Sequence, residues 1–300
     1  MDIRISFPLG TFKDSGAAFL FIHDVVKFDI NVISSVTSFP DGDWFSNVDD
    51  VATDLSTNND HIFDLHDGKN IDDHGMVSVN AVVFRREPYY NLEVFAIGLK
   101  EVEKLDYERL IKKSAECGFT TIIGMDFLKA KWQSERFVQN YITFGKPHEH
   151  LDKMEDLVLG KSFGPVIDIS KNPGHEIQTY EMYLMAAPEM WFGPGSWKYF
   201  DKKLVSTFPN GIEVNEILPD VVYVKLFDWT TPDYETPEIL ALQKKFRKWV
   251  KMDEVEANLN NMTSPLYEVA TLKLDLKDPD NPKEEFSILS AVKNIFRKKK

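Results

Sequence analysis

The chain has 300 residues, and its 43% hydrophobic and 13% aromatic content is enough to bury a core, which excludes a disordered protein. Its 48 acidic and 35 basic side chains give a net charge of −13, which repels nucleic acid and anionic lipid. Cys117 is the only cysteine, so an intrachain disulfide and a cysteine-built zinc site are excluded.

The first half of the chain mixes strand-like and helix-like segments. Alternating or β-branched runs predict strands at residues 2–7, 17–22, 28–36, 76–85, 92–99 and 119–124. Residues 38–73 are crowded with Asp, Asn, Ser and Gly, so we expect a long loop with at most a short helix near 48–55. Apolar residues at helical spacing predict helices at 105–117, ended by Gly118, and at 125–141.

The second half repeats this mixture. Strands are predicted at 166–169, 177–187 and 267–276, a hairpin at 212–217 and 221–227, and a last helix at 286–296. Thr236 as an N-cap and Pro237 in the first turn predict a helix that runs to about Met252. Because strands arrive as hairpins, the predicted fold class is α+β, with mixed or mainly antiparallel sheets and helices packed on their faces.

A charged stretch punctuated by Gly145, Pro147 and Gly160 marks a candidate boundary near Lys153. It predicts two subdomains, residues 1–152 and 153–300, with a single continuous domain as the alternative. The start MDIRISFPLG lacks a basic region followed by an apolar one, and the early apolar run is too short to cross a bilayer. We therefore expect no signal peptide, no membrane span and a cytoplasmic protein.

The densest chemical cluster is the segment 60–74, where three histidines and five carboxylates fall within fifteen residues. Imidazole and carboxylate are the ligands that Zn²⁺, Mn²⁺ and Fe²⁺ prefer. The candidate metal ligands are His61, Asp64, His66, Asp72 and His74. Their spacing matches no compact metal motif, and a solvated loop rich in turn formers has the same composition.

Three further residues or pairs invite a chemical role. His148 and His150 would project from one face of a strand, as a ligand pair does, but they follow Pro147 in an apparent connection. Cys117 falls in the last turn of a predicted helix, where the partial negative charge raises a thiol pKa. Ser196 lacks the second glycine of a nucleophile elbow. We therefore expect no catalytic residue and no cofactor.

The run MWFGPGSWKYF at residues 190–200 is the most aromatic stretch of the chain. Tryptophan and tyrosine anchor protein interfaces, so this run could be an exposed recognition loop. Large aromatic side chains are also typical of a buried corner where glycines let strands approach closely. Both interpretations stay open at the level of sequence.

Residues 163–252 resemble the bacterial immunity proteins that are encoded beside polymorphic toxins. The resemblance rests on a strand leading into EMWFGPGSWKYF, the KKLVSTFP turn, a hairpin ending in VVYVKLFDW and the helix that starts at TPEILALQKKFRKW. It implies stoichiometric neutralisation of a cognate toxin, with acidic residues and exposed aromatics capping a basic active site. The predicted partner-binding residues are Trp191, Phe192, Trp197, Tyr199, Asp228, Trp229, Asp233 and Glu235.

The alternative function is a metal-dependent hydrolase in which the 60–74 segment holds an ion that activates water. A small-ligand-binding or scaffold module is a third interpretation. The two leading hypotheses differ in a measurable way, because only the hydrolase requires stoichiometric metal.

Overall fold

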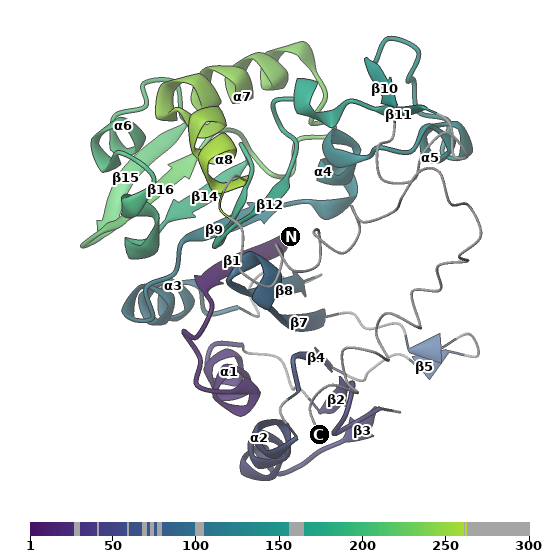
Figure 1. The fold of residues 1–300 in the computed structure, drawn as a ribbon, viewed down its shortest axis with the longest axis vertical. Helices are drawn as coiled ribbons and strands as arrows, with labels where there is room; N and C mark the ends of the chain where they lie inside the picture. The colour runs from purple at the N-terminus through teal and green to yellow at the C-terminus, as the bar shows by residue number, and fades with distance from the viewer. Residues whose placement is uncertain are drawn as a thin grey trace, which may run out of the picture. The chain divides into compact units, whose positions relative to one another are not determined.

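The computed structural model describes residues 1–26, 31–40, 42–58, 60–67, 71–72, 75–76, 80–99, 105–155, 165–260 and 262. Within this part of the chain, helices pack against a large antiparallel sheet, so the predicted α+β class is confirmed. Figure 1 traces the order of the elements from the N-terminus. The predicted strand at 267–276 and helix at 286–296 lie outside the described residues.

The elements have the following bounds. The helices are α1 (Ser15–His23), α2 (Val48–Thr57), α3 (Tyr107–Glu116), α4 (Phe127–Ser134), α5 (Val138–Thr143), α6 (Lys202–Ser206), α7 (Pro237–Val250) and α8 (Met252–Asn260), with short 3-10 turns η1 (Pro88–Tyr90), η4 (Ile169–Lys171) and η5 (Pro194–Lys198). The strands of the large sheet are β1 (Asp2–Pro8), β2 (Val32–Ser35), β3 (Asp43–Trp44), β4 (Ile62–His66), β7 (Asn80–Glu87), β8 (Leu92–Leu99), β9 (Thr121–Met125), β14 (Glu189–Phe192), β15 (Glu213–Leu218) and β16 (Val221–Lys225). Three small pairs complete the list: β5 (Ile71–Asp72) with β6 (Gly75–Met76), β10 (Lys153–Glu155) with β11 (Pro165–Ile167), and β12 (Ile177–Thr179) with β13 (Met182–Leu184).

The large sheet has ten strands in the order β15-β16-β14-β9-β1-β8-β7-β4-β2-β3. Every neighbouring pair in it is antiparallel. The first strand of the chain, β1, lies in the middle, between β8 and β9. This position joins strands from the first half of the chain to β14, β16 and β15 from the second half.

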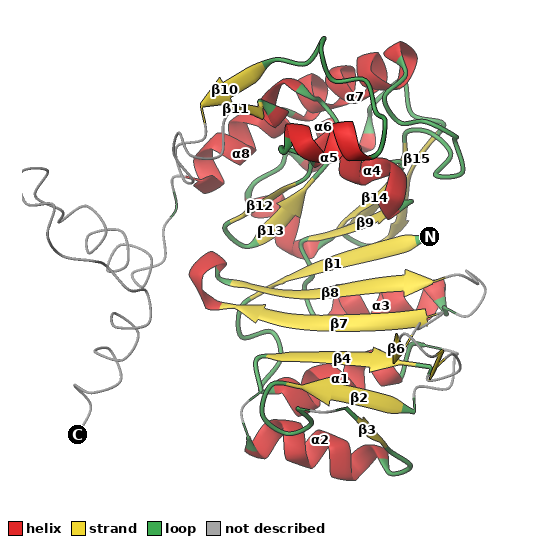
Figure 2. Cartoon of the chain, turned by 90° about the vertical axis from the view of Figure 1, so that its right-hand side faces the viewer, coloured by secondary structure: helices red, strands yellow, loops and turns green. Residues whose placement is uncertain are grey.

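Two hydrophobic cores lie on opposite faces of this sheet. Figure 2 shows α1, α2 and α3 on one face of β8, β7 and β4, where Phe19, Phe63 and Phe95 belong to the first core. The second core joins β9, β14 and β16 to α7 and α8. Because successive side chains of a strand point to opposite faces, Ile122 of β9 enters the first core and Ile123 the second. Strand β9 is therefore buried on both faces.

Several predicted elements are confirmed. In each, the sequence signal comes from residues that are neighbours in the chain. The Thr236 hydroxyl accepts a hydrogen bond from the Ile239 amide at 3.4 Å, so it caps α7 as expected. Gly118 follows α3 with a φ of +72°, a left-handed conformation that glycine adopts without strain. The β15–β16 hairpin also forms, with Asp220 at a φ of +61° in its turn.

Four predictions of secondary structure are wrong. The expected strand at 177–187 forms two antiparallel strands, β12 and β13, because the chain turns at Glu181, whose φ is +67°. Residues 17–22 belong to a helix, because the Asp14 carboxylate caps α1 at the Ala17 amide, 2.8 Å away. The prediction failed because a continuous apolar run has no periodicity that distinguishes a helix from a strand. The expected loop at 38–73 contains α2, as predicted, but also β4, whose Phe63 and Leu65 enter the first core. The expected helix at 125–141 is interrupted at Glu135, which is extended, so it forms α4 and α5.

Residues 1–262 cluster as one compact unit. The large sheet takes strands from both sides of Lys153, and β10 begins at that residue. The division into subdomains 1–152 and 153–300 stays a prediction about how the chain is organised.

Candidate functional site

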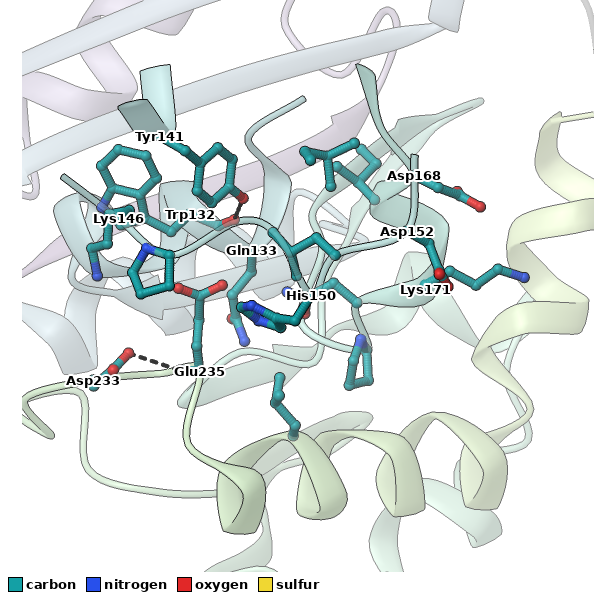
Figure 3. Close-up of a pocket in the computed structure, with 17 residues that line it drawn as sticks. Trp132, Gln133, Tyr141, Lys146, His150, Asp152, Asp168, Lys171, Asp233 and Glu235 are labelled. Atoms are coloured by element: carbon teal, nitrogen blue, oxygen red, sulfur yellow. Dashed lines mark hydrogen bonds between the residues drawn. The ribbon is translucent and has the colours of Figure 1, made fainter. Parts of the chain in front are cut away.

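A cavity of about 380 Å³ lies between α4, α5, the segment that precedes α7 and the residues around η4. We call it the Glu235 pocket; Figure 3 shows its lining. Its charged and aromatic lining residues are Trp132, Tyr141, Lys146, His150, Asp152, Asp168, Lys171, Asp233 and Glu235. Its size falls at the small end of the range of roughly 300–1,000 Å³ typical of ligand pockets.

A small aromatic core forms one wall of the pocket. The rings of Trp132 and Tyr141 meet edge to face with centroids 5.1 Å apart, and Ile167 of β11 packs beside them. The Tyr141 hydroxyl donates a hydrogen bond to the Trp132 carbonyl at 2.8 Å. Glu135 sets the start of α5, because its carboxylate accepts hydrogen bonds from the Phe137 amide and the Asn140 side chain, both at 2.8 Å. These contacts fix the angle between α4 and α5, the two helices at this wall of the pocket.

Two buried glutamines tie this wall to α7. The Gln133 side-chain amide donates to the Gln243 side-chain oxygen at 2.9 Å and to the Tyr234 carbonyl at 3.0 Å. Gln243 donates in turn to the Ala186 carbonyl at 2.8 Å. A Cβ at Gly174 would come within 2.2 Å of the Gln133 side-chain oxygen, so a larger residue there would displace this amide from its hydrogen bonds. Buried polar pairs of this kind are costly to break, which makes the base of the pocket rigid.

The segment from Asp233 to Thr236 brings two carboxylates to the pocket. The Asp233 carboxylate accepts a hydrogen bond from the Glu235 amide at 2.9 Å, and Thr236 then begins α7 as its N-cap. This local turn places the Glu235 side chain inside the pocket, while Asp233 stays exposed at the rim. Figure 3 shows the Glu235 carboxylate between the side chains of Lys146 and His150.

The ionisation of Glu235 reflects its environment. Burial raises the pKa of Glu235 above its ordinary value, the charges of Lys146 and His150 oppose that rise, and the Asp233 carboxylate adds to it. Among the described residues, the Glu235 carboxylate has no hydrogen bond or ion pair. A half-buried carboxylate without a direct partner can receive a cation from outside the chain.

Exposed apolar side chains surround α5, one of the helices that border the pocket. Phe137, Ile142 and Phe144, at the two ends of α5, are each about half exposed or more. The Phe144 ring lies 5.7 Å from the ring of Trp132, which lines the pocket, and the Lys131 ammonium lies within 5 Å of both rings. We call Phe137, Ile142 and Phe144 the α5 flank. Together, the pocket and its flank combine carboxylates with accessible apolar surface.

The predicted partner-binding residues separate into two groups. Trp191 and Phe192 of β14 are 5% and 2% exposed and enter the first and second cores respectively, so in this fold they are core residues. Trp197 and Tyr199 are half-buried, and they donate hydrogen bonds to the Asp220 carbonyl at 2.9 Å and the Glu181 carboxylate at 2.7 Å.

The other four predicted residues lie between β16 and α7. Asp228 is exposed and pairs with Lys225 at 2.6 Å, and Trp229 is half-buried. Asp233 and Glu235 are the two predicted residues that line the pocket. Trp132, Tyr141 and Lys146 were not predicted. The two aromatic residues fit the spacing of a helix core, and this spacing does not indicate that they border a cavity.

The candidate metal ligands are partly described. Asp64 and His66 lie on the same face of β4, because they are two residues apart on a strand, and His61 is exposed just before it. Within the described part of the chain, no three His, Cys, Asp or Glu side chains are placed to hold a metal ion. The Asp72 side chain and His74 lie outside the described residues, so the metal site stays a prediction.

Other expectations can be compared with the structure. His148 and His150 lie in a turn before β10 and not on a strand, and His150 lines the Glu235 pocket. The pKa of Cys117 is raised, first by burial and then by the Glu116 charge, in the direction expected of an unreactive thiol. Ser196 is buried and its hydroxyl donates to the Thr120 carbonyl, which is a structural role.

Comparisons with known proteins give no relative for this chain: no family model, no curated protein and no solved structure matches it. None of the described helices has the length and apolar character needed to cross a bilayer. The function must therefore be argued from the site itself.

Proposed function

We propose that this chain is a binding protein that neutralises a cognate protein toxin by forming a stoichiometric complex with its basic surface. The observation that carries the proposal is the Glu235 pocket, where a carboxylate without an ion-pair partner lies beside the exposed α5 flank. We further propose that a lysine or arginine side chain of the toxin enters this pocket.

The charge of the pocket suits a cationic side chain. Four carboxyl groups, those of Asp152, Asp168, Asp233 and Glu235, line it against two lysines and one histidine. The Trp132 ring already attracts cations, since the ammonium groups of Lys131 and Lys146 lie 4.8 and 5.5 Å from its centroid. The long-range attraction of an acidic chain for a basic partner would also speed their encounter.

The α5 flank suits a protein partner better than a small molecule. Phe137, Ile142 and Phe144 lie outside the cavity lining, so a ligand confined to the pocket would leave them in water. A protein surface would cover Phe144, whose ring packs beside Trp132 at the pocket, while inserting one side chain into the pocket. Aromatic anchors of this kind carry much of the binding free energy at protein interfaces.

The test is co-expression with the product of the neighbouring gene, which for an immunity protein encodes the toxin. We expect protection from growth arrest and a one-to-one complex by size-exclusion chromatography with light scattering. Glu235→Gln should weaken the complex at least about tenfold, because the cation loses its charge partner. The matched control is Glu238→Gln, since Glu238 is exposed in the first turn of α7 and does not line the pocket.

Two results would overturn the proposal. If the neighbouring product forms no complex and the chain gives no protection, the function is wrong. If a complex forms but Glu235→Gln and Glu238→Gln weaken it equally, the chain is a binding protein whose binding surface lies elsewhere.

A further inference from the structure

A second cavity, of about 370 Å³, lies beside the Glu235 pocket and shares Lys171 and Pro173 with it. We call it the basic pocket. Its lining residues are Ser170, Lys171, Pro173, Lys244, Arg247, Lys248, Lys251, Asp253 and Glu254. Figure 3 shows the Lys171 side chain extending away from Glu235 and His150, so its ammonium group is directed out of the acidic cavity.

The two carboxylates of the basic pocket already have partners. The buried Arg247 guanidinium pairs with Asp253 at 2.6 Å and also with Glu256. Glu254 lies 3.9 Å from the Lys251 ammonium. The ammonium groups of Lys171, Lys244 and Lys248, in contrast, have no ion pair in the described part of the chain. Three positive charges are therefore left without compensation around one cavity, in a chain whose net charge is −13.

Helix electrostatics explain only part of this arrangement. Lys248 lies in the last turn of α7, where the partial negative charge of the helix terminus favours a cation. Lys244 lies one turn earlier, and Lys171 belongs to η4, a separate segment across the cavity. Lys244 and Lys248 are also four residues apart on one helix face, a like-charge spacing that destabilises a helix. An anion in the cavity would remove this repulsion.

We propose that the basic pocket binds a small anion that carries a phosphate group, with Lys171, Lys244 and Lys248 as its charge partners. A phosphate group matches three ammonium groups better than a singly charged carboxylate does, since it carries close to two negative charges at neutral pH. Ser170 is not a donor to this anion, because its hydroxyl donates to the Asp168 carboxylate at 2.6 Å.

The ligand is a small soluble compound and not a phosphate-bearing surface. A membrane or a nucleic acid would bring many negative charges against the rest of an acidic chain, whereas a small anion meets only the local field of the pocket. This inference is independent of the proposed toxin, because the two pockets have opposite charge and share only Lys171 and Pro173.

The experiment is a titration of the full chain with inorganic pyrophosphate at low ionic strength, followed by calorimetry and by the thermal midpoint of unfolding. We expect saturable binding to one site and a midpoint that rises with pyrophosphate concentration. The double variant Lys244→Gln, Lys248→Gln should lose at least about tenfold in affinity, which corresponds to about 1.4 kcal/mol. These side chains are exposed, so the variant should fold normally, and its midpoint without ligand checks this.

The matched control is Lys203→Gln, because Lys203 is an exposed lysine of α6 that lines no part of the basic pocket. It should bind pyrophosphate as the unmodified chain does. The proposal is overturned if pyrophosphate does not saturate one site. It is equally overturned if the Lys244 and Lys248 variant binds as tightly as the Lys203 control.

Discussion

The aromatic segment at 190–200 and the Glu235 pocket differ in what their chemically distinctive residues do. Trp191 and Phe192 are buried on opposite faces of β14, and each completes a different core. The pocket instead holds a half-buried carboxylate that has no direct partner among the described residues. A side chain whose interactions are all satisfied within the fold explains stability, whereas an unsatisfied one points to a ligand.

The largest expected effect separates the buried aromatics from the exposed ones. Phe192→Ala should lower the free energy of unfolding by about 3–5 kcal/mol, because it leaves a cavity among Trp197, Phe200 and Phe246. Phe144→Ala should change it by less than about 0.5 kcal/mol, since Phe144 is 63% exposed. Urea unfolding of both variants measures the difference, and equal losses would contradict the contrast between core and flank.

The base of the pocket should behave like a core although it is polar. Gln243→Leu removes the donor to the Ala186 carbonyl and the partner of Gln133, so we expect a loss of about 1–3 kcal/mol. Gln139→Leu is the control, because Gln139 is exposed on α5 and bonds only to Thr143 of its own helix in the described structure. If both substitutions have the same small effect in urea unfolding, the glutamine pair does not hold the pocket together.

Local signals in the sequence predicted the elements around the site better than the site itself. The Thr236 cap, the α7 helix and the β15–β16 hairpin follow from residues close together in the chain. The strand order could not be predicted, because the pairing of β1 with β9 and of β9 with β14 joins segments far apart in sequence. The helix α1 was missed because its residues are apolar on most sides.

The pocket was predicted only in part, for the same physical reason. Asp233 and Glu235 stood out as carboxylates, but Trp132 and Tyr141 have the spacing of ordinary helix-core residues. What makes them a pocket wall is the contact with β11, which depends on tertiary structure, and the break at Glu135, whose local hydrogen bonds with Phe137 and Asn140 the helical spacing does not reveal. The burial of Trp191 and Phe192 likewise follows from the position of β14 between β9 and β16.

The smallest expected effect is a change in how stability depends on pH. Because burial raises the pKa of Glu235 in the folded chain, the native state binds this proton more tightly than the unfolded state does. The charged carboxylate therefore destabilises the fold, and the penalty appears as pH rises from the ordinary glutamate value through the raised one. Glu235→Gln removes the titration, so the variant should be more stable than the unmodified chain at neutral pH and not at acidic pH. We expect a gain of about 0.5 kcal/mol or less, since partial exposure screens the charge.

Glu238→Gln should change the stability at neutral pH in the opposite direction. Glu238 lies in the first turn of α7, where a negative charge stabilises the helix by roughly 0.3–1 kcal/mol, so its loss should destabilise the chain at neutral pH. Urea unfolding of both variants across the acidic to neutral range measures the two trends. A loss of stability for Glu235→Gln at neutral pH would mean that the carboxylate has a structural partner. A gain would mean that the chain retains Glu235 although this residue lowers stability. Such a cost is expected of a group that binds a ligand.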